Sequence, residues 1–354
     1  MRQPRIGLAL GCGGAKALVH MGVLKVLEDH DIPIHAVSGC SMGAYVGALW
    51  ASGVSADKMI HLAAEMGDKD SFKKLADPAV PPIKGLFYGH KIKDHLEATI
   101  GNPKIEELDR NFIAIAANLE NYQRVVFDSG NLLEAVHASC AMPGIIVPVE
   151  VNGVRCVDGG VVDPVPVNVL KKYTDVDYVI AISTTPTLHD LDSDEAVEAI
   201  VVEVAENEAE SAGAWFKSKF SSLGKKYNPI AKGNMLDTLR RSLKASQIRI
   251  AHDACRKADV AVFPVCNDSA WDEYERYEHF ISLGAKETLA VIDKIKTLTE
   301  PVEDHDEVKE KMEEPAIVEK VDQELDQELD PNSDQNKKEE NEQKDEPKTL
   351  PSES

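Results

Sequence analysis

The sequence lacks the features that mark membrane-spanning, disulfide-bonded or zinc-binding proteins. No stretch reaches the roughly 18 consecutive apolar residues of a transmembrane helix, and the N-terminus lacks the basic, apolar and small-residue order of a signal peptide. The six cysteines contain no CxxC pair and no regular spacing, which argues against a zinc site or a disulfide framework. We therefore expect a cytoplasmic protein with reduced thiols and with no metal or other cofactor.

Positive charge is also scarce. The 39 Lys and Arg residues are outnumbered by 61 Asp and Glu, and the formal net charge is -22. Residues 301–354 contribute twenty acidic residues against seven lysines, which leaves -9 for the first 300 residues. Broad electrostatic capture of nucleic acid or of an anionic bilayer requires clustered Lys and Arg, so we expect no nucleic-acid partner.

The C-terminal segment has no aromatic residue beyond Pro301 and repeats Asp-Gln-Glu-Leu in tandem over 322–329. Because so little apolar surface cannot offset the entropy of ordering the chain, residues 300–354 are predicted to be a disordered acidic tail. A short helix that forms on a protein partner is the weaker alternative. Such a tail would suit a non-catalytic regulatory or adaptor protein, a function of a different class from the one that the motifs below indicate.

The first 50 residues contain two successive strand-loop-helix units. Residues 5–10 form an apolar run that ends at a glycine-rich loop and is followed by a helical spacing of apolar residues over 15–29. The second unit joins a strand at 34–39 to a helix rich in small residues at Met42–Ala51. Two such units indicate a parallel sheet with helices packed on it. Further strands are predicted at 111–118, 124–128, 154–157, 178–183 and 260–265, and the last helix at 274–296.

We expect residues 1–299 to form one folded domain, in which the mostly helical stretch 188–257 is a cap-like region. Trp215, Phe216 and Phe220 lie there among lysines. Such a helix can rest on a membrane, with its rings in the interface and its lysines near phosphates. An ordinary amphipathic packing helix is the favoured interpretation, so peripheral membrane contact is the weaker expectation.

The run Gly39-Cys40-Ser41-Met42-Gly43 fits the pattern G-x-S-x-G and lies between a predicted strand and a predicted helix. This context is that of a nucleophile elbow, in which glycine two residues either side of the serine avoids collisions with neighbouring backbone. The N-terminus of the helix offers positive potential to a developing oxyanion. Ser41 is therefore the predicted nucleophile, and a buried serine that caps the helix is the alternative.

Backbone N–H groups that stabilise an oxyanion are expected from two places. One follows the nucleophile, at Met42, and the others come from the loop formed by Gly11, Cys12, Gly13 and Gly14. The same loop could cradle a nucleotide phosphate. However, G-x-G-x-x-G would need glycine where lysine stands at position 16, and a Walker A loop would need a Gly-Lys-Ser/Thr ending. Nucleotide binding is therefore disfavoured.

Two polar residues follow this loop. Lys16 opens the next helix, where a cation opposes the helix dipole and calls for a compensating anion such as a lipid phosphate or an acidic side chain. A solvated surface lysine is the equally supported alternative. His20 lies one turn further on, and a lone helical histidine is more often structural than catalytic.

Three motifs in this order resemble those of the patatin-like phospholipase family: the glycine loop with Lys16, the elbow around Ser41, and the triplet Asp158-Gly159-Gly160. The chain is most similar to the small bacterial members, in the neuropathy-target-esterase-like branch. Supporting stretches are His20 ahead of Gly22-Val23-Leu24, residues 138–144, and Pro164-Val165-Pro166. The resemblance covers residues 5–295 and implies a three-layer α/β fold with a central, mainly parallel sheet.

The resemblance further implies a serine–aspartate dyad without histidine, acting on a lipid or other acyl ester. Ser41 would attack the ester carbonyl, Asp158 would accept its proton, and water would later release the fatty acid from an acyl-enzyme. Because a carboxylate near its reference pKa of about 4 is a weak base towards a hydroxyl, the site must strengthen it. Asp163 is interpreted as structural. The alternative for Asp158 is a turn residue that binds backbone N–H groups ahead of two glycines.

A lipid transacylase, which uses a lipid alcohol in place of water, fits the same motifs. Two positions depart from the commonest family pattern, because Cys12 stands where glycine is usual and Ala17 replaces a glycine that often follows the basic residue. A Cβ at position 12 narrows the backbone angles open to the loop. Acyl-chain preference, the physiological substrate and the oligomeric state do not follow from the sequence.

Overall fold

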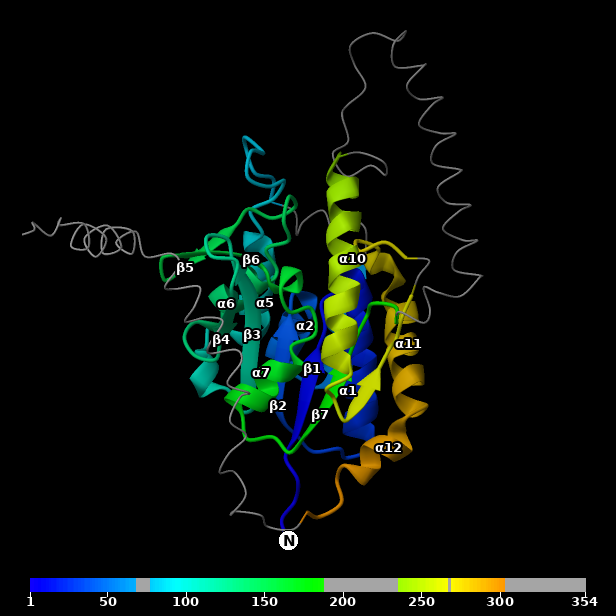
Figure 1. Cartoon of the computed structure of the whole chain (residues 1–354). Helices are drawn as coiled ribbons and strands as arrows, with labels where there is room; N and C mark the ends of the chain where they lie inside the picture. Colours follow the sequence, from blue (N-terminus) through cyan, green and yellow to red (C-terminus); the bar gives the residue numbers. More distant parts are fainter. Residues whose placement is uncertain (68–76, 188–234, 267–268, 303–354) are drawn as a thin grey trace, which may run out of the picture. The chain divides into compact units, whose positions relative to one another are not determined.

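Within the residues that the computed structural model describes (1–67, 77–187, 235–266 and 269–302), eight strands form one sheet in the order β5-β6-β3-β2-β1-β7-β8, and β4 pairs with β3 outside this path (Figure 1). The strands are β1 (Ile6–Leu10), β2 (Ile34–Cys40), β3 (Asn111–Asn118), β4 (Arg124–Phe127), β5 (Val149–Val151), β6 (Val154–Asp158), β7 (Tyr178–Ile182) and β8 (Val260–Val262).

The centre of this sheet is parallel and one side of it is antiparallel. Five neighbouring strands, β3-β2-β1-β7-β8, run parallel to one another. By contrast, β4 and β6 pair with β3, and β5 pairs with β6, in antiparallel fashion. The prediction of a central, mainly parallel sheet is therefore confirmed. In open α/β sheets of this kind, ligands bind beyond the carboxyl ends of the parallel strands.

Helices cover both faces of the sheet. The α-helices are α1 (Val19–Asp29), α2 (Met42–Ala51), α3 (Ala56–Gly67), α5 (His90–Ile100), α6 (Leu132–Ser139), α7 (Val167–Tyr173), α10 (Met235–Cys255), α11 (Tyr277–Leu289) and α12 (Ile292–Thr297). Short 3₁₀ helices are η1 (Gly14–Leu18), η2 (Ile105–Glu107), η3 (Gly159–Val161) and η4 (Tyr274–Arg276). In Figure 1, α7 and α10 lie in front of the strands.

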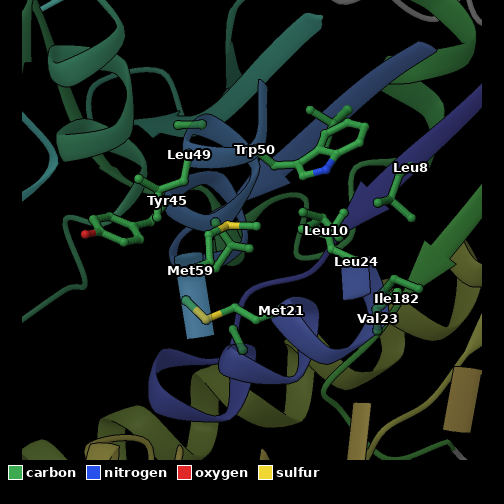
Figure 2. Packing of buried hydrophobic residues seen from close by; sticks show 14 of the residues in the cluster. Leu8, Leu10, Met21, Val23, Leu24, Tyr45, Leu49, Trp50, Met59 and Ile182 are labelled. Carbon is green, nitrogen blue, oxygen red and sulfur yellow. The ribbon is translucent and has the colours of Figure 1, made fainter. Parts of the chain in front are cut away.

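Two hydrophobic cores lie on opposite faces because successive side chains of a strand point in opposite directions. Along β1, Leu8 and Leu10 enter a large core with residues of α1, α2, α3 and α11, whereas Ala9 enters a smaller core with residues of α7 and α10. Figure 2 shows Leu10, Met21 and Leu49 among the side chains of the large core. The three-layer architecture that the resemblance implied is therefore confirmed.

Two elements differ from the sequence prediction. The strand predicted over 260–265 ends at Val262, because its neighbour β7 ends at the paired residue Ile182 and offers no further ladder. The helix predicted over 274–296 is divided into η4, α11 and α12, with a non-helical backbone at Val291. After this break, α12 buries two isoleucines in the large core, which favours the change of direction.

The described residues from Met1 to Val302 form one compact unit. Of the stretch 188–257 predicted as a cap, the structure describes residues from 235 onward, where α10 forms and contacts α7 and η3. Trp215, Phe216 and Phe220, proposed for membrane contact, and the acidic tail from 303 lie outside the described residues. Within the described part of the chain, no helix combines the length and the apolar character needed to cross a bilayer.

Candidate active site

The site forms where two strands end against neighbouring residues of β3. Cys40, the last residue of β2, pairs with Ile115, and Asp158, the last residue of β6, pairs with Ala116. β2 runs parallel to β3 and β6 antiparallel, so the two strands approach from opposite directions and end at the same level. This register brings Ser41 next to Asp158, although 117 residues separate them in the chain.

Ser41 occupies a strained backbone turn between β2 and α2. Its φ of 56° and ψ of -127° lie outside the regions that residues with a side chain usually adopt. The turn leaves no room for a side chain at either flank. A Cβ on Gly39 would lie 2.5 Å from the carbonyl oxygen of Gly43, and a Cβ on Gly43 would lie 2.3 Å from the carbonyl oxygen of Leu10. Both flanking positions of the elbow therefore require glycine.

The hydroxyl of Ser41 points at the carboxylate of Asp158. Ser41 Oγ donates a hydrogen bond of 2.5 Å to Asp158 Oδ2, and each residue is only 5% exposed. Asp158 Oδ1 accepts the N–H of Gly160 at 2.8 Å, and the thiol of Cys40 lies 3.9 Å from the same oxygen. A hydroxyl on one oxygen and a backbone amide on the other fix the orientation of the carboxylate.

The burial of Asp158 changes its acidity. Desolvation raises the pKa of Asp158 from its ordinary value of 3.8 to about 6, and hydrogen bonds from Ser41, Gly160 and Cys40 offset part of this rise. Within the described residues, the groups that act on this carboxylate are neutral hydrogen-bond donors. A carboxylate with a raised pKa is a stronger base towards a hydroxyl than an ordinary aspartate.

Asp163, the second acid near the triplet, has a different environment. Its Oδ2 accepts a hydrogen bond of 2.6 Å from Arg124 Nη1. Burial raises the pKa of Asp163, whereas the charge and hydrogen bond of Arg124 lower it. A carboxylate neutralised by a guanidinium group suits the structural role expected for Asp163.

The glycine loop between β1 and η1 lies beside the elbow, and its first two amides are engaged in the fold. The N–H of Gly11 donates to a β7 carbonyl at 3.0 Å, and that of Cys12 donates to the carbonyl of Pro164 at 2.9 Å. Among the described residues, none accepts a hydrogen bond from the N–H of Gly13 or Gly14. Gly14 has a φ of 58°, and a Cβ there would lie 2.4 Å from a backbone oxygen. The backbone N–H groups at the end of the loop, those of Gly13 and Gly14, are therefore the ones that remain able to donate to a bound ligand.

The two polar residues that follow the loop make contacts away from the serine. Lys16 Nζ donates to the carbonyl oxygen of Cys266 at 2.6 Å. His20 is fully buried, and its Nε2–H donates to the carbonyl oxygen of Gly11 at 2.7 Å. Burial lowers the pKa of His20 to about 4, so its ring is neutral at pH 7. Its hydrogen bond supports the glycine loop rather than the hydroxyl of Ser41.

A cavity of about 150 Å³ opens beside Ser41. Its lining is mainly apolar and comes from several elements, with Ile92 from α5, Met142 and Ile146 from the segment after α6, and Trp271 from the segment before η4. An apolar cavity next to a buried hydroxyl can accept a hydrocarbon chain, because burying apolar surface is favourable.

Two polar side chains in this lining satisfy each other. The hydroxyl of Tyr45 and Nδ1 of His95 form a hydrogen bond of 2.6 Å, and burial raises the pKa of Tyr45 and lowers that of His95. The pair is therefore neutral at pH 7. A larger depression of about 670 Å³ lies around Asn111, at the amino end of β3, and neither Ser41 nor Asp158 lines it.

Two parts of this site, Ser139 and Trp271, were not predicted from the sequence. Ser139 Oγ accepts the backbone N–H of Ser41 at 2.9 Å, yet Ser139 was singled out only as part of the stretch 138–144. Trp271 lies against Gly14 and lines the cavity. No sequence motif includes Trp271, because it comes near Gly14 only in the tertiary structure. Across the described ranges, no group of three or more His, Cys, Asp and Glu side chains is placed to hold a metal ion.

Comparison with known proteins agrees with the motifs. A family model described as patatin-like phospholipase matches residues 8–171. An uncharacterized NTE family protein of Mycobacterium tuberculosis is 37% identical over 163 residues, which are 46% of this chain and 44% of that one. The lysophospholipase NTE1 of Candida albicans is 28% identical over 178 residues, 50% of this chain and 13% of that one. The chain thus spans less than half the length of these relatives.

Solved structures give a more distant likeness. VipD from Legionella pneumophila covers 83% of this chain, with 67% of its own length, at 14% identity and a TM-score of 0.40. The type III effector ExoU covers 84% of this chain, with 54% of its own length, at 14% identity and a TM-score of 0.38. The family match spans the loop, the elbow and the Asp158 triplet, so residues 8–171 of this chain are similar to the patatin-like phospholipase family across all three motifs.

Proposed function

We propose that this chain hydrolyses carboxylic esters of lipids through an acyl-enzyme formed on Ser41. The observation that carries this proposal is the 2.5 Å hydrogen bond from Ser41 Oγ to Asp158 Oδ2, in a buried place where the pKa of the carboxyl group is raised to about 6. Asp158 takes the hydroxyl proton as Ser41 attacks the ester carbonyl, and then gives it to the leaving alcohol. Asp158 next deprotonates a water molecule, which releases the carboxylic acid and restores Ser41.

The tetrahedral intermediates of this reaction carry a negative oxygen that needs hydrogen-bond donors. Met42 opens α2, where a first-turn N–H has no acceptor within the helix and the helix dipole favours negative charge. The N–H groups of Gly13 and Gly14 complete the proposed oxyanion hole. Gly11 and Cys12, which were expected to contribute, leave this set because their N–H groups donate to carbonyl groups of the fold.

The apolar cavity beside Ser41 is the proposed place for the acyl chain. The names of the relatives, a patatin-like phospholipase family and a fungal lysophospholipase, support a lipid as the substrate class. Lys16 is not among the residues that line the cavity, so no contact between Lys16 and the substrate is included in the proposal. We further propose that the enzyme works in the cytoplasm, and peripheral membrane contact stays the weaker expectation.

Two alternative functions are ranked below hydrolysis. A lipid transacylase would use the same acyl-enzyme with a lipid alcohol as the acceptor, and product analysis with a lysolipid acceptor separates the two. An adaptor function would depend on the acidic tail, which lies outside the described residues. No observation in the described residues favours either alternative over hydrolysis.

Covalent labelling tests the proposal directly. The full-length protein is treated with a fluorophosphonate ester, the bound mass is read from the intact protein, and hydrolysis of p-nitrophenyl butyrate is measured in parallel. Labelling and turnover of the parent, with loss of both in a folded S41A variant, are expected. S38A is the matched control, because Ser38 is a buried serine of β2 whose Oγ donates only to a backbone carbonyl, that of Pro166. A parent without labelling, or a labelled S41A, contradicts the proposal.

A further inference from the structure

The backbone N–H of Ser41 takes part neither in the hydrogen bonds of the sheet nor in those of helix α2. The strand β2 ends at Cys40, and Ser41 is the N-cap residue of α2, so its N–H belongs neither to the sheet nor to the helix. A buried amide without a partner costs free energy comparable to a lost hydrogen bond. Here the partner is a side chain, because Ser139 Oγ accepts this N–H at 2.9 Å.

Ser139 is itself held by the sheet. It is the last residue of α6, is completely buried, and its Oγ donates a hydrogen bond of 2.6 Å to the carbonyl oxygen of Ile115. Ile115 is the β3 residue that pairs with Cys40. A chain of hydrogen bonds thus runs from β3 through one hydroxyl to the backbone of the nucleophile. The hydroxyl acts as donor at one end and as acceptor at the other, a combination that Ala cannot supply.

The same short segment also holds the other member of the pair. Two residues after Ser139, the carbonyl oxygen of Ala141 accepts the N–H of Asp158 at 2.8 Å. The segment 139–141 therefore contacts the backbone of Ser41 and of Asp158 at once. Because the φ of 56° at Ser41 is strained, such a turn persists only where the surroundings hold it in place.

We propose that Ser139 is a positioning residue for Ser41: its hydroxyl ties the amide of Ser41 to the Ile115 carbonyl and so sets the direction of Ser41 Oγ towards Asp158. This inference rests on the proposed hydrolase function and deepens it. Ser139 touches no substrate in this mechanism. It acts through the geometry of Ser41, so its removal slows the chemical step and leaves substrate binding in the apolar cavity.

The test compares S139A with S38A in the full-length protein. Each change removes one buried serine hydroxyl that donates to a backbone carbonyl, so both lower the thermal midpoint. Only S139A also releases the amide of Ser41. For S139A we expect kcat on p-nitrophenyl butyrate to fall about 10- to 100-fold with KM changed less than about threefold, whereas kcat of S38A stays within about twofold of the parent.

A second variant covers failure of S139A to fold. S139C keeps nearly the size of serine, but its thiol is a weak acceptor for the Ser41 amide, so a lower kcat is again expected. A parental kcat in folded S139A or S139C overturns the role of Ser139 alone, as does a loss confined to KM. A parent that hydrolyses no ester overturns the proposed function, and this inference with it.

Discussion

Ser41 Oγ lies 2.5 Å from Asp158 Oδ2. The two residues meet because β2 and β6 end against the adjacent β3 residues Ile115 and Ala116. The two residues are fixed by different means. Ser41 is held by a strained turn that depends on glycine at both flanks, whereas the carboxylate of Asp158 is held by the N–H of Gly160. Burial raises the pKa of the Asp158 carboxyl group to about 6, and in the proposed mechanism this carboxylate takes the role that histidine has in the Ser-His-Asp triad.

Replacing the two nearby acids should separate catalysis from stability. D158N keeps the shape of the side chain but removes the base, so kcat/KM on p-nitrophenyl butyrate should fall about 10³- to 10⁴-fold. D163N breaks the ion pair with Arg124, so it should lower the free energy of unfolding by about 1–3 kcal/mol and leave kcat near the parental value. Loss of turnover in D163N with turnover retained in D158N would show that the base is assigned to the wrong residue.

Ester hydrolysis should depend on pH through Asp158. Because burial raises its pKa to about 6, the carboxyl group is protonated below that pH and cannot accept the proton of Ser41. We expect kcat/KM to fall about tenfold per pH unit below pH 6 and to level off above it. The measurement is initial rates between pH 4.5 and 8, with enzyme stability checked at each pH, in about half-unit steps. A midpoint near 4 would mean that the carboxylate is solvated in solution.

The same shift predicts a cost in stability. The folded-state pKa of Asp158, about 6, lies above its ordinary value of 3.8, so between these pH values the folded protein binds a proton that the unfolded chain has released. This contribution to stability is therefore present below about pH 4 and is lost as the pH rises to about 6, by about 3 kcal/mol. D158N, which cannot ionise, should unfold at higher temperature than the parent at pH 8 but not at pH 4. Equal shifts at both pH values would contradict this account.

Narrowing the apolar cavity should change the preference for acyl chains. Ile92 lines the cavity from α5, and I92W places a larger ring there. The ratio of kcat/KM for octanoyl over acetyl p-nitrophenyl esters should fall about tenfold or more, because the longer chain loses its apolar contacts. L289W, at an exposed position of α11, serves as the control. An unchanged ratio in I92W would remove the cavity from the proposed substrate site.

A methyl group added at two glycines of α2 should destabilise the protein strongly at one position and little at the other. G43A drives a Cβ to 2.3 Å from the backbone oxygen of Leu10, which the fold cannot relieve by moving a side chain. We expect urea unfolding to show a loss of about 3 kcal/mol or more. G47A, one turn later, meets side-chain atoms no closer than 3.3 Å, and the helix propensity of alanine should keep its stability within about 1 kcal/mol of the parent. Similar losses in both variants would contradict the steric explanation.

Apolar periodicity and glycine-rich turns predicted a parallel sheet with helices packed on it, because both are local properties, whereas the three-layer arrangement was implied by the family resemblance. The continuous apolar run at 6–10 fits a strand that is buried on both faces, and strand geometry places Leu8 and Ala9 in different cores. The division of the last helix at Val291 was not predicted, because its apolar spacing continues across the break. The sequence offers no proline or glycine there, and burial of Ile292 and Ile295 in the core decides the geometry.

For the site, the order of the glycine loop, the elbow and the Asp158 triplet carried the resemblance that predicts Ser41 as nucleophile and Asp158 as its base. The structure brings these two side chains within 2.5 Å of each other, and their catalytic roles stay predictions. Each of these motifs is set by local backbone geometry, which a short run of residues can specify. Only the tertiary structure showed that the N–H groups of Gly11 and Cys12 donate to backbone carbonyls of the fold, and that Ser139 Oγ accepts the N–H of Ser41. Hydrogen bonds between segments far apart in the chain depend on strand register and packing, and no local pattern of residues encodes them.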